Sequence, residues 1–357
     1  MIYSFSSFGY EGSLVNVEAD VRSGISATDI VGISDGCVKE TRERVKSAYT
    51  NALRELGIEY PNARVLVSLS PCDLKKNGTG YDLAIALSIY LEQNLFNDEL
   101  GKSVRDNFGD VLVMGELELS GGVRNVKAVY AGLQTAVKNG IRYAIVPHGA
   151  NLEIPRGIKV ATVGNLYEAC DAFLSLGDTK YFKENTEKVD NTFKVEFEDV
   201  SEEESLDGIK GHNGLKYAMA VAVAGRHNIL AYGAHDYGKT LVLQRMTQLL
   251  PKLTNEELMS VDRIYSIAGL SGSSVTKDRT RPFRIPHQTA SLEGICGGGV
   301  HCNPGEVSLA HNGVLFLDEA AEFRTSVLQM LRVPLESNIL TLSRAGRTTV
   351  YPARFQL

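Results

Sequence analysis

One eight-residue segment, Gly233-Ala-His-Asp-Tyr-Gly-Lys239-Thr240, restricts the fold of this chain more than any other feature. It matches the pattern G-x-x-x-x-G-K-[ST], in which backbone N–H groups surround the phosphates of a bound nucleotide. Such a loop connects a buried strand to a helix that begins at the lysine. We therefore expect a strand over 228–233 and a helix from Lys239 through Leu250, within an α/β domain.

The residue types of this loop point to ATP and Mg²⁺ as ligands. Gly233 and Gly238 allow the backbone to approach the phosphates, Lys239 would reach the β- and γ-phosphates, and the Thr240 hydroxyl would hold Mg²⁺. Asp236 occupies an interior position that often has a left-handed backbone, which Asp tolerates. Its carboxylate would repel phosphates, which is an electrostatic cost to affinity, but we expect a complete domain to bind nucleotide normally. The alternative is a glycine-rich turn without a ligand.

A second acidic feature follows about eighty residues later. Val314-Leu-Phe-Leu is an apolar run that ends in Asp318 and Glu319, as expected for a buried strand that delivers two carboxylates to its C-terminal edge. Asp318 would assist the coordination of Mg²⁺, and Glu319 would polarise an attacking water. An apolar strand ending in Asp-Glu is weak evidence alone, but together with the phosphate loop it predicts nucleotide hydrolysis.

Length and composition limit the remaining possibilities. A chain of 357 residues predicts two domains, and the formal net charge of −6 argues against a broadly basic nucleic-acid surface while allowing a local basic patch. No apolar stretch reaches the ~18 residues of a membrane span, and the N-terminus lacks a signal-peptide pattern. We therefore expect a cytoplasmic protein without a membrane partner.

The five cysteines are scattered without C-x-x-C spacing, which predicts reduced thiols rather than a disulfide framework. Cys296, His301 and Cys302 lie close together and raise the alternative of a zinc site. Because this cluster lacks a second pair of ligands, a structural loop is the favoured interpretation.

Residues 1–176 alternate strand-like and helix-like segments, which predicts an α/β domain with a mixed sheet. A charged linker over 177–204 follows, and a second domain occupies 205–357. The expected strands are 14–21, 64–69, 111–119 and 143–147, and the expected helices are 39–56, 81–91 and 128–139.

Longer motifs resemble one known family. They are Asp29-Ile-Val-Gly-Ile-Ser-Asp with Val38-Lys-Glu-Thr-Arg-Glu-Arg-Val45, Asp73-Leu-Lys-Lys-Asn-Gly-Thr-Gly-Tyr-Asp82, Gly115-Glu-Leu-Glu-Leu-Ser-Gly-Gly-Val-Arg124, Arg281-Pro-Phe-Arg-Ile-Pro-His287, Pro304–Glu319 and Ser343–Leu357. Together they resemble the magnesium-chelatase-like AAA+ proteins of the ComM/YifB type, which are associated with competence and DNA processing. The resemblance covers nearly the whole chain.

The resemblance implies a ribosomal S5/Lon-protease-like N-terminal domain followed by the N-terminal portion of an AAA+ ATPase domain. It also implies a hexameric ring that hydrolyses ATP and, in the competence branch, drives branch migration of DNA. Gly233, Gly238, Lys239 and Thr240 match the family's nucleotide loop. Asp318 and Glu319 match its metal-binding and water-activating acids.

A Lon-like domain raises the alternative of a Ser–Lys protease. Alignment of the motifs places Gly80 at the nucleophile position and Tyr130 at the lysine position, and neighbouring Thr79 and Lys127 do not restore the pair. Without a nucleophile and a base there is no acyl transfer, so proteolysis is not expected.

The last motif ends at Leu357, where the resemblance places the start of the strand that carries a sensor residue, between the phosphate-loop strand and the Asp-Glu strand. The arginine finger and helical lid would lie beyond it, so we expect inefficient ATP turnover from these residues alone. Arg344 and Arg347 fall on a hairpin that would face a ring pore and contact DNA phosphates; the alternative is two solvated arginines.

Two other functions stay open at this point. The chain could be a non-enzymatic binding or assembly module with an idle nucleotide site. Metal insertion into a tetrapyrrole, as in the true chelatases, is less favoured because the Lon-like domain belongs to the competence branch.

Overall fold

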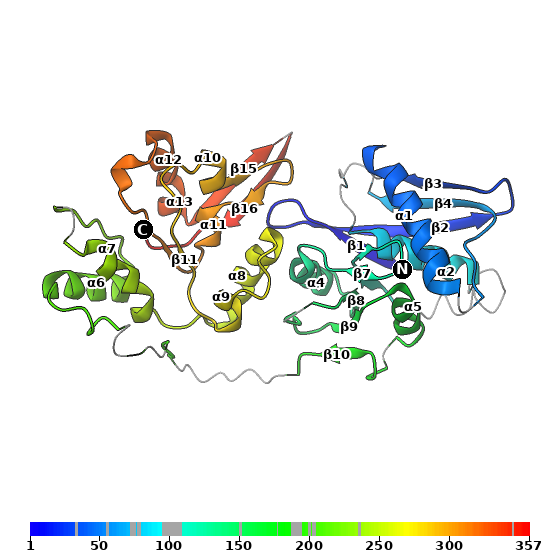
Figure 1. The fold of residues 1–357 in the computed structure, drawn as a ribbon, viewed down its shortest axis with the longest axis horizontal. Helices are drawn as coiled ribbons and strands as arrows, with labels where there is room; N and C mark the ends of the chain where they lie inside the picture. Colours follow the sequence, from blue (N-terminus) through cyan, green and yellow to red (C-terminus); the bar gives the residue numbers. More distant parts are fainter. Residues whose placement is uncertain are drawn as a thin grey trace. The chain divides into compact units, whose positions relative to one another are not determined.

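The computed structural model describes residues 1–32, 35–54, 57–71, 76, 80–94, 109–149, 152–176, 178–186, 195–198, 201, 205–234, 237–344 and 346–357. The chain divides into two compact units (Figure 1). Unit 1 comprises Met1–Ser7 and Glu11–Lys188, and unit 2 comprises Phe8–Tyr10 and Val189–Leu357.

Unit 1 is built on an eight-stranded mixed sheet. The order is β10-β9-β8-β5-β1-β2-β4-β3. The pairs β9–β8, β8–β5, β5–β1 and β4–β3 are parallel, and β10–β9, β1–β2 and β2–β4 are antiparallel. The strands are β1 (Ile2–Ser6), β2 (Ser13–Arg22), β3 (Ala27–Val31), β4 (Arg64–Ser70), β5 (Val111–Val113), β8 (Tyr143–Pro147), β9 (Lys159–Val163) and β10 (Phe182–Glu184).

Helices cover both faces of this sheet. On one face α1 (Asp35–Leu53), α2 (Asp82–Asn94) and α5 (Leu166–Leu174) pack against one another and share a core with Ile2 of β1. Side chains alternate along a strand, so Phe5 of β1 points to the opposite face. There it lies against Gly132 of α4 (Val129–Lys138). The short strands β6 (Glu116–Leu117) and β7 (Val123–Arg124) form a separate antiparallel pair.

Most of the elements expected in residues 1–176 are confirmed. The strands over 14–21, 64–69 and 143–147 and all three expected helices are present, with ends that agree or shift by up to four residues. The strand expected over 111–119 is broken, because Gly115 bonds outside the sheet: its N–H donates to Gly80 O and its carbonyl accepts from Leu83 N. Part of the segment expected as a linker lies in the sheet, since β10 pairs with β9.

Unit 2 consists of short helices around small strand pairs. The helices are α6 (Asn213–Gly225), α7 (Lys239–Gln244), α8 (Asn255–Ala268), α9 (Ser274–Lys277), α10 (Leu292–Cys296), α11 (Glu306–Leu309), α12 (Thr325–Met330) and α13 (Arg332–Ser337), with 3₁₀ turns at Arg245–Leu249 and Ala320–Glu322. The strands are β11 (Phe283–Arg284), β12 (Gly297–Gly298), β13 (Asn303–Pro304), β14 (Val314–Leu315), β15 (Ile339–Arg344) and β16 (Arg347–Pro352).

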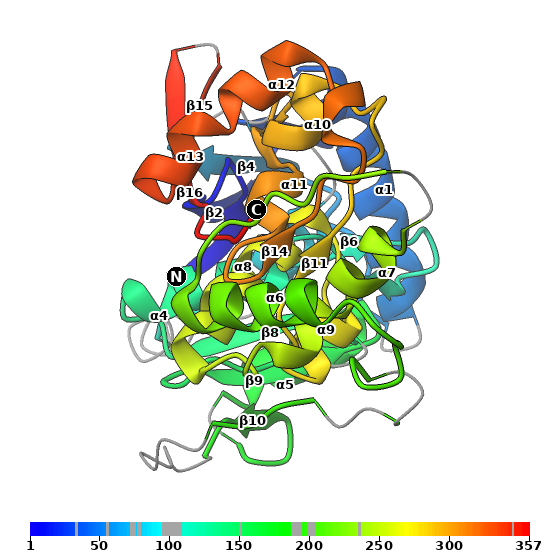
Figure 2. The same ribbon diagram turned by 90° about the vertical axis from the view of Figure 1, so that its left-hand side faces the viewer.

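The last residues of the chain pair with two segments of unit 2. Leu315 N–H donates to Gln356 O at 2.8 Å, and Ile229 N–H donates to Leu357 O at 2.9 Å. The segment therefore lies between Ile229 and β14, close to β11 in both ribbon views (Figures 1 and 2). This confirms its expected position between the phosphate-loop segment and the Asp-Glu segment.

The strand expected over 228–233 is not formed, and that prediction was wrong. Within this segment, Ile229 N–H donates to Leu357 O and the Asn228 side chain accepts from Leu357 N–H, but no strand of the described residues pairs with 230–233. Leu230 and Tyr232 are 81% and 91% exposed. Apolar spacing predicts a strand only where a neighbour supplies hydrogen bonds and covers the side chains. The expected helix over 239–250 is also shortened, because α7 ends at Gln244 and continues as a 3₁₀ turn.

Two arginines of the Arg281–His287 motif hold unit 2 together. Arg281 is 5% exposed and forms two hydrogen bonds with the Glu257 carboxylate, at 3.1 and 2.8 Å. Burial would raise the pKa of Glu257, but the hydrogen bonds from Arg281, from Thr254 N–H and from Arg226, together with the charge of Arg281, outweigh burial and lower that pKa to about 2. Arg284 pairs with Glu306 in the same two-bond manner, at 2.6 and 2.8 Å. The motif thus stabilises β11 and the start of α8.

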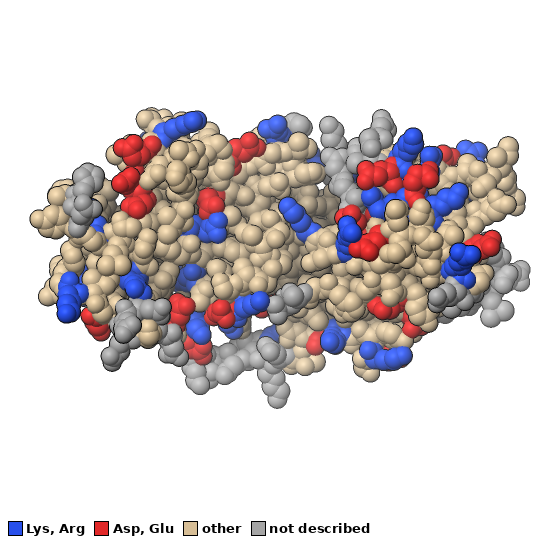
Figure 3. Space-filling view, viewed as in Figure 1, with Lys and Arg blue, Asp and Glu red and all other residues tan. Residues whose placement is uncertain are grey.

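The surface carries both signs of charge. On the face drawn in Figure 3, Lys and Arg lie among Asp and Glu rather than in one continuous basic region. Within the parts of the chain that the structure describes, no helix has the length and apolar character needed to cross a membrane.

Candidate nucleotide-binding site

The phosphate loop ends in a left-handed glycine. Gly238 has φ 70° and precedes α7, which begins at Lys239. A Cβ atom at this glycine would lie 3.3 Å from His212 Nε2 and would force a strained backbone. The predicted contact residue Asp236 lies outside the described residues. The short helix beginning at the lysine agrees with the order required of a phosphate loop.

The Lys239 ammonium group lies over its own loop. Its Nζ donates to Gly233 O at 3.1 Å and also to Ala234 O. These carbonyls hold the amine beside Gly233 and Ala234, where it can exchange backbone acceptors for phosphate oxygens. Lys239 is therefore positioned for the electrostatic role expected of it.

Thr240 and Asp318 come together at the site. The Thr240 hydroxyl Oγ1 donates to Asp318 Oδ1 at 3.1 Å, across 78 residues of sequence. Thr240 is the second residue of α7, and Asp318 follows β14 by three positions. A hydroxyl and a carboxylate side by side are the hard oxygen ligands that Mg²⁺ prefers. The donor set therefore fits the cation that sequence reasoning assigned to these two residues.

Glu319 lies beside a residue that sequence reasoning missed. Gln288 Nε2 donates to Glu319 Oε2 at 3.4 Å. The parallel pairing of β11 with β14 places Phe283 opposite Val314, and Gln288 opposite Glu319 keeps the same 31-residue offset. The register of the two strands thus carries Gln288 to the acid. No sequence pattern indicated this partner, because the pairing of β11 with β14 was not predicted.

His287 orders the turn that follows β11. Its Nδ1 accepts from the Thr289 N–H at 3.2 Å and lies 2.8 Å from Thr289 Oγ1, and its carbonyl accepts from Ala290 N. These contacts indicate that His287 shapes the turn. The turn leaves Gln288 next to Glu319.

The two candidate DNA-contacting arginines lie opposite each other on a hairpin. Arg344 ends β15 and Arg347 begins β16, and the two residues are paired in register. The Arg344 side chain is exposed, whereas the Arg347 guanidinium lies 3.6 Å from the centre of the Phe8 ring. The two arginines therefore differ in their surroundings.

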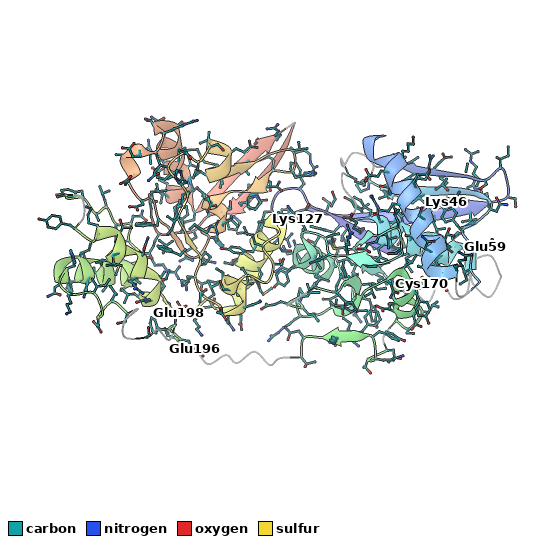
Figure 4. All side chains as sticks on the ribbon, in the orientation of Figure 1. Lys46, Glu59, Lys127, Cys170, Glu196 and Glu198 are labelled. Atoms are coloured by element: carbon teal, nitrogen blue, oxygen red, sulfur yellow. The ribbon has the colours of Figure 1, made fainter. Side chains whose placement is uncertain are left out.

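Of the positions compared with a Ser–Lys protease in the sequence, Gly80, Lys127 and Tyr130 lie among the described residues. Tyr130, at the expected lysine position, is 6% exposed in α4, and Lys127 precedes that helix (Figure 4). Thr79 lies outside the described residues. Asp82 at the start of α2 is buried, and its Oδ2 accepts from Arg44 Nε at 2.6 Å. Burial raises the pKa of Asp82 to about 7 against the lowering effect of Arg44.

The cysteines near His301 are packed as core residues. Cys296 is 4% exposed and Cys302 1% exposed, and burial raises the pKa of the Cys296 thiol to about 11. The carbonyl of Cys302 accepts from the buried Tyr351 hydroxyl at 2.9 Å. Among the described residues, no group of three or more His, Cys, Asp or Glu side chains is arranged to hold a metal ion.

Comparison with known proteins covers both units. The family described as magnesium chelatase, subunit ChlI, matches residues 205–357, and the family described as subunit ChlI of Mg-chelatase matches residues 17–150. The chain is 36% identical over 362 residues to the competence protein ComM of Haemophilus influenzae, and 34% identical over 359 residues to the YifB protein of Escherichia coli.

Both of these alignments span 100% of this chain, but only 67% of ComM and 66% of YifB. The chain therefore spans about two thirds of the length of these relatives. A shorter stretch is 47% identical over 64 residues to the DNA repair protein RadA of Pseudomonas aeruginosa, covering 18% of this chain and 14% of RadA. Since identity extends over both units, the chain belongs to the magnesium-chelatase-like protein family of the ComM/YifB type.

Proposed function

We propose that unit 2 binds ATP with Mg²⁺ at the phosphate loop, and that the intact assembly uses ATP hydrolysis to remodel DNA. The observation that carries this proposal is the 3.1 Å hydrogen bond between Thr240 and Asp318. It joins Thr240 of the phosphate loop to Asp318, three positions beyond β14, so two motifs that are 78 residues apart in sequence lie in contact. A glycine-rich turn without a ligand would not need this partner.

Each side chain of the site would have one task. Gly233 and Gly238 let the loop backbone surround the phosphates, and Lys239 neutralises part of their charge. Thr240 and Asp318 would hold the Mg²⁺ that accompanies the nucleotide, and this ion supplies charge neutralisation on the phosphates when bound. Glu319 would orient the attacking water, with Gln288 next to its carboxylate.

The test is equilibrium binding of ATP to the full chain with and without Mg²⁺. We expect Lys239→Ala to weaken binding at least ~10-fold, because one charge-assisted phosphate contact is lost. The matched control is Lys277→Ala, which removes an exposed lysine at the end of α9. Equal affinity of the wild type and Lys239→Ala would refute the nucleotide site.

A second candidate is a binding module that holds nucleotide without turning it over. The observation favouring it is the unpaired segment 230–233, in which Leu230 and Tyr232 are exposed. A loop without a strand behind it is held less firmly, and catalysis depends on firm positioning. Glu319→Gln separates the two candidates: it abolishes turnover in an ATPase and leaves nucleotide affinity unchanged in either case.

Several wider features belong to the same proposal. Unit 1 would have the S5/Lon-protease-like fold without its catalytic pair, and unit 2 would be the N-terminal portion of an AAA+ module, with the domain limits expected near 176 and 205. The chain would assemble with itself as a hexameric ring. DNA phosphates would contact the β15–β16 hairpin through Arg344 and Arg347. The names ComM and RadA, a competence protein and a DNA repair protein, support a role in recombination.

Stimulation of ATPase activity by branched duplex DNA would support the DNA role. The result expected from a chelatase-type function is different: stimulation by a tetrapyrrole-bearing partner and not by DNA.

A further inference from the structure

Three residues from the N-terminus of the chain are part of unit 2. Phe8, Gly9 and Tyr10 belong to it by their contacts, although the rest of the unit begins at residue 189. Gly9 N–H donates to His301 O at 2.8 Å, and Tyr10 N–H donates to Thr349 Oγ1 at 3.0 Å. The Tyr10 carbonyl in turn accepts from Arg263 Nε at 2.8 Å. The backbone of this segment is thus bonded to three separate parts of unit 2.

The two aromatic rings add contacts on either side of the glycine. The Tyr10 ring meets Tyr351 edge-on at 5.8 Å between centres, and the Arg263 guanidinium lies 5.2 Å from its centre. Phe8 lies under the guanidinium of Arg347 at 3.6 Å. Both distances between arginine and ring are within the ~6 Å range of a cation–π interaction.

Position 9, between the two rings, requires glycine because the backbone there lies very close to the Thr349 side chain. Gly9 has φ 57°, and a Cβ atom there would lie 2.1 Å from Thr349 Oγ1 and 2.3 Å from Thr349 Cβ. The segment therefore rests with its backbone directly on β16. A larger residue at position 9 would push the segment away from the strand.

These contacts converge on the hairpin that carries the candidate DNA-contacting arginines. Thr349, Tyr351 and Arg347 all belong to β16, whose pairing with β15 places Arg347 opposite Arg344. The Phe8 ring packs against the guanidinium group of Arg347, whereas the Arg344 side chain is exposed. The arrangement distinguishes two arginines that sequence reasoning treated as equivalent.

We infer that Phe8–Tyr10 is an intrachain clamp that fixes the β15–β16 hairpin. In this clamp the Arg347 guanidinium stays packed on the Phe8 ring and is less available to a ligand. Arg344 then becomes the principal phosphate-contacting side chain of the hairpin. The assignment to Arg344 rests on the proposed DNA function, whereas the clamp does not. Gly9 and Tyr10 act as positioning residues, since they hold β16 and touch no proposed ligand.

The clamp is tested first by hydrogen–deuterium exchange of the hairpin amides in the full chain. We expect Gly9→Ala to speed exchange at 347–352 by at least about 10-fold, because the added methyl group displaces the segment from Thr349. The matched control is Gly211→Ala. Gly211 also has a positive φ, 78°, but its Cβ position is open.

Phe8→Leu provides a milder variant, in case Gly9→Ala prevents folding. It removes the ring while keeping an apolar side chain, and we expect faster exchange at Arg347 and Thr348. Unchanged exchange in both Gly9→Ala and Phe8→Leu would overturn the clamp.

The role of Arg344 is tested by the salt dependence of duplex DNA binding. Arg344→Ala should lower the salt slope by about 0.9, the value for one phosphate contact, and should do so by more than Arg347→Ala. In a double-mutant cycle, Arg347→Ala should cost more affinity in the Phe8→Leu background than in the wild type, because Phe8→Leu releases the guanidinium. Equal effects of Arg347→Ala in both backgrounds would overturn the inference that the Phe8 ring keeps Arg347 from contacting DNA.

A failure of the clamp can be distinguished from a failure of the proposed DNA contact. If no variant, the wild type included, binds DNA in a salt-dependent manner while exchange still responds to Gly9→Ala, then the clamp stands and the proposed DNA contact is wrong.

Discussion

Thr240 Oγ1 lies 3.1 Å from Asp318 Oδ1, and this hydrogen bond joins the phosphate loop to the acidic end of β14. Each residue was assigned to Mg²⁺ from a different motif, and neither motif contains information about the other. Their contact is the strongest structural argument that the two motifs serve one site. It also makes Thr240 a sensitive position for mutation.

We predict that Thr240→Val weakens Mg²⁺-dependent ATP binding by about 10-fold or more, while Thr240→Ser retains most of it. Valine has the shape of threonine but no hydroxyl, so one oxygen ligand and one hydrogen bond to a carboxylate are lost, about 1.5–3 kcal/mol. Isothermal titration with and without Mg²⁺ measures the effect. Equal losses in Thr240→Ser and Thr240→Val would show that the hydroxyl is not a ligand.

Gly313 should not tolerate alanine, for steric reasons. A Cβ atom there would lie 2.0 Å from Pro282 O, at the point where β14 meets β11. Because the obstacle is backbone, Gly313→Ala must shift the strand pair, and we expect a loss of about 2 kcal/mol or more in the free energy of unfolding. Urea denaturation of the full chain checks this value.

Replacing glycine by alanine should instead raise the free energy of unfolding at Gly214. This glycine lies in α6, and no atom lies within 4 Å of its Cβ position. Gly214→Ala should stabilise by about 0.5–1 kcal/mol through helix propensity. A matching loss at Gly214 and Gly313 would contradict the steric explanation.

The Arg281–Glu257 pair should contribute far more to stability than a surface pair. Arg281→Met leaves the Glu257 carboxylate without its main partner, and removal of one member of a buried pair costs about 3–5 kcal/mol. We expect the lower end of this range, because Arg226 also donates to Glu257 at 3.1 Å. Thermal unfolding measures the difference.

Arg332 offers the control for that measurement. It pairs with Glu336 one helical turn away, and the two side chains are 80% and 66% exposed. Arg332→Met should therefore cost less than about 1 kcal/mol. If it costs as much as Arg281→Met, burial does not explain the importance of the Arg281–Glu257 pair.

His311 should make unit 2 less stable in acid. Burial and the nearby Arg354 lower the pKa of His311 to about 4 from its ordinary 6.5, so the folded state stays neutral where the unfolded chain takes up a proton. The unfolded state then binds more protons between about pH 6.5 and pH 4, and the free energy of unfolding falls as the pH drops through this window. The loss from this group is at most about 3 kcal/mol.

One contact in the folded state depends on the neutral ring: His311 Nδ1 accepts a hydrogen bond from Arg354 N–H at 3.1 Å. Protonation would convert this acceptor into a donor and release the segment that leads to Leu357. His311→Gln keeps an acceptor without titrating, so its unfolding free energy should vary less between pH 6.5 and pH 4 than that of the wild type. An identical slope in the two proteins would rule out His311 as the source.

Much of unit 1 could be predicted from local patterns. The alternation over β2 and β4 and the helical spacing of α1 and α4 each depend on residues that are neighbours in sequence. The broken strand after β5 could not be predicted, because Gly115 exchanges its hydrogen bonds with Gly80 and Leu83 in another part of the chain.

In unit 2 the motifs predicted one contact between distant residues better than they predicted the secondary structure. Thr240 and Asp318 are hydrogen-bonded to each other, as expected of two residues assigned to one ion, whereas residues 228–233 form no strand with the described part of the chain. The apolar residues over 228–233 look like a strand in sequence, but only Ile229 has a backbone partner among the described residues. A strand forms only when a neighbouring segment pairs with it, so the sequence of one segment alone cannot determine whether it becomes a strand.

The sequence by itself determined the family, the α/β class and the residue types that can hold a nucleotide with Mg²⁺, because these depend on short patterns of chemically distinct residues. Only the tertiary structure decided that Gln288 reaches Glu319 and that Phe8 covers Arg347. The first contact depends on the register of two strands, and the second joins residues more than three hundred positions apart. No local pattern encodes such contacts, since they form only when separate segments pack together.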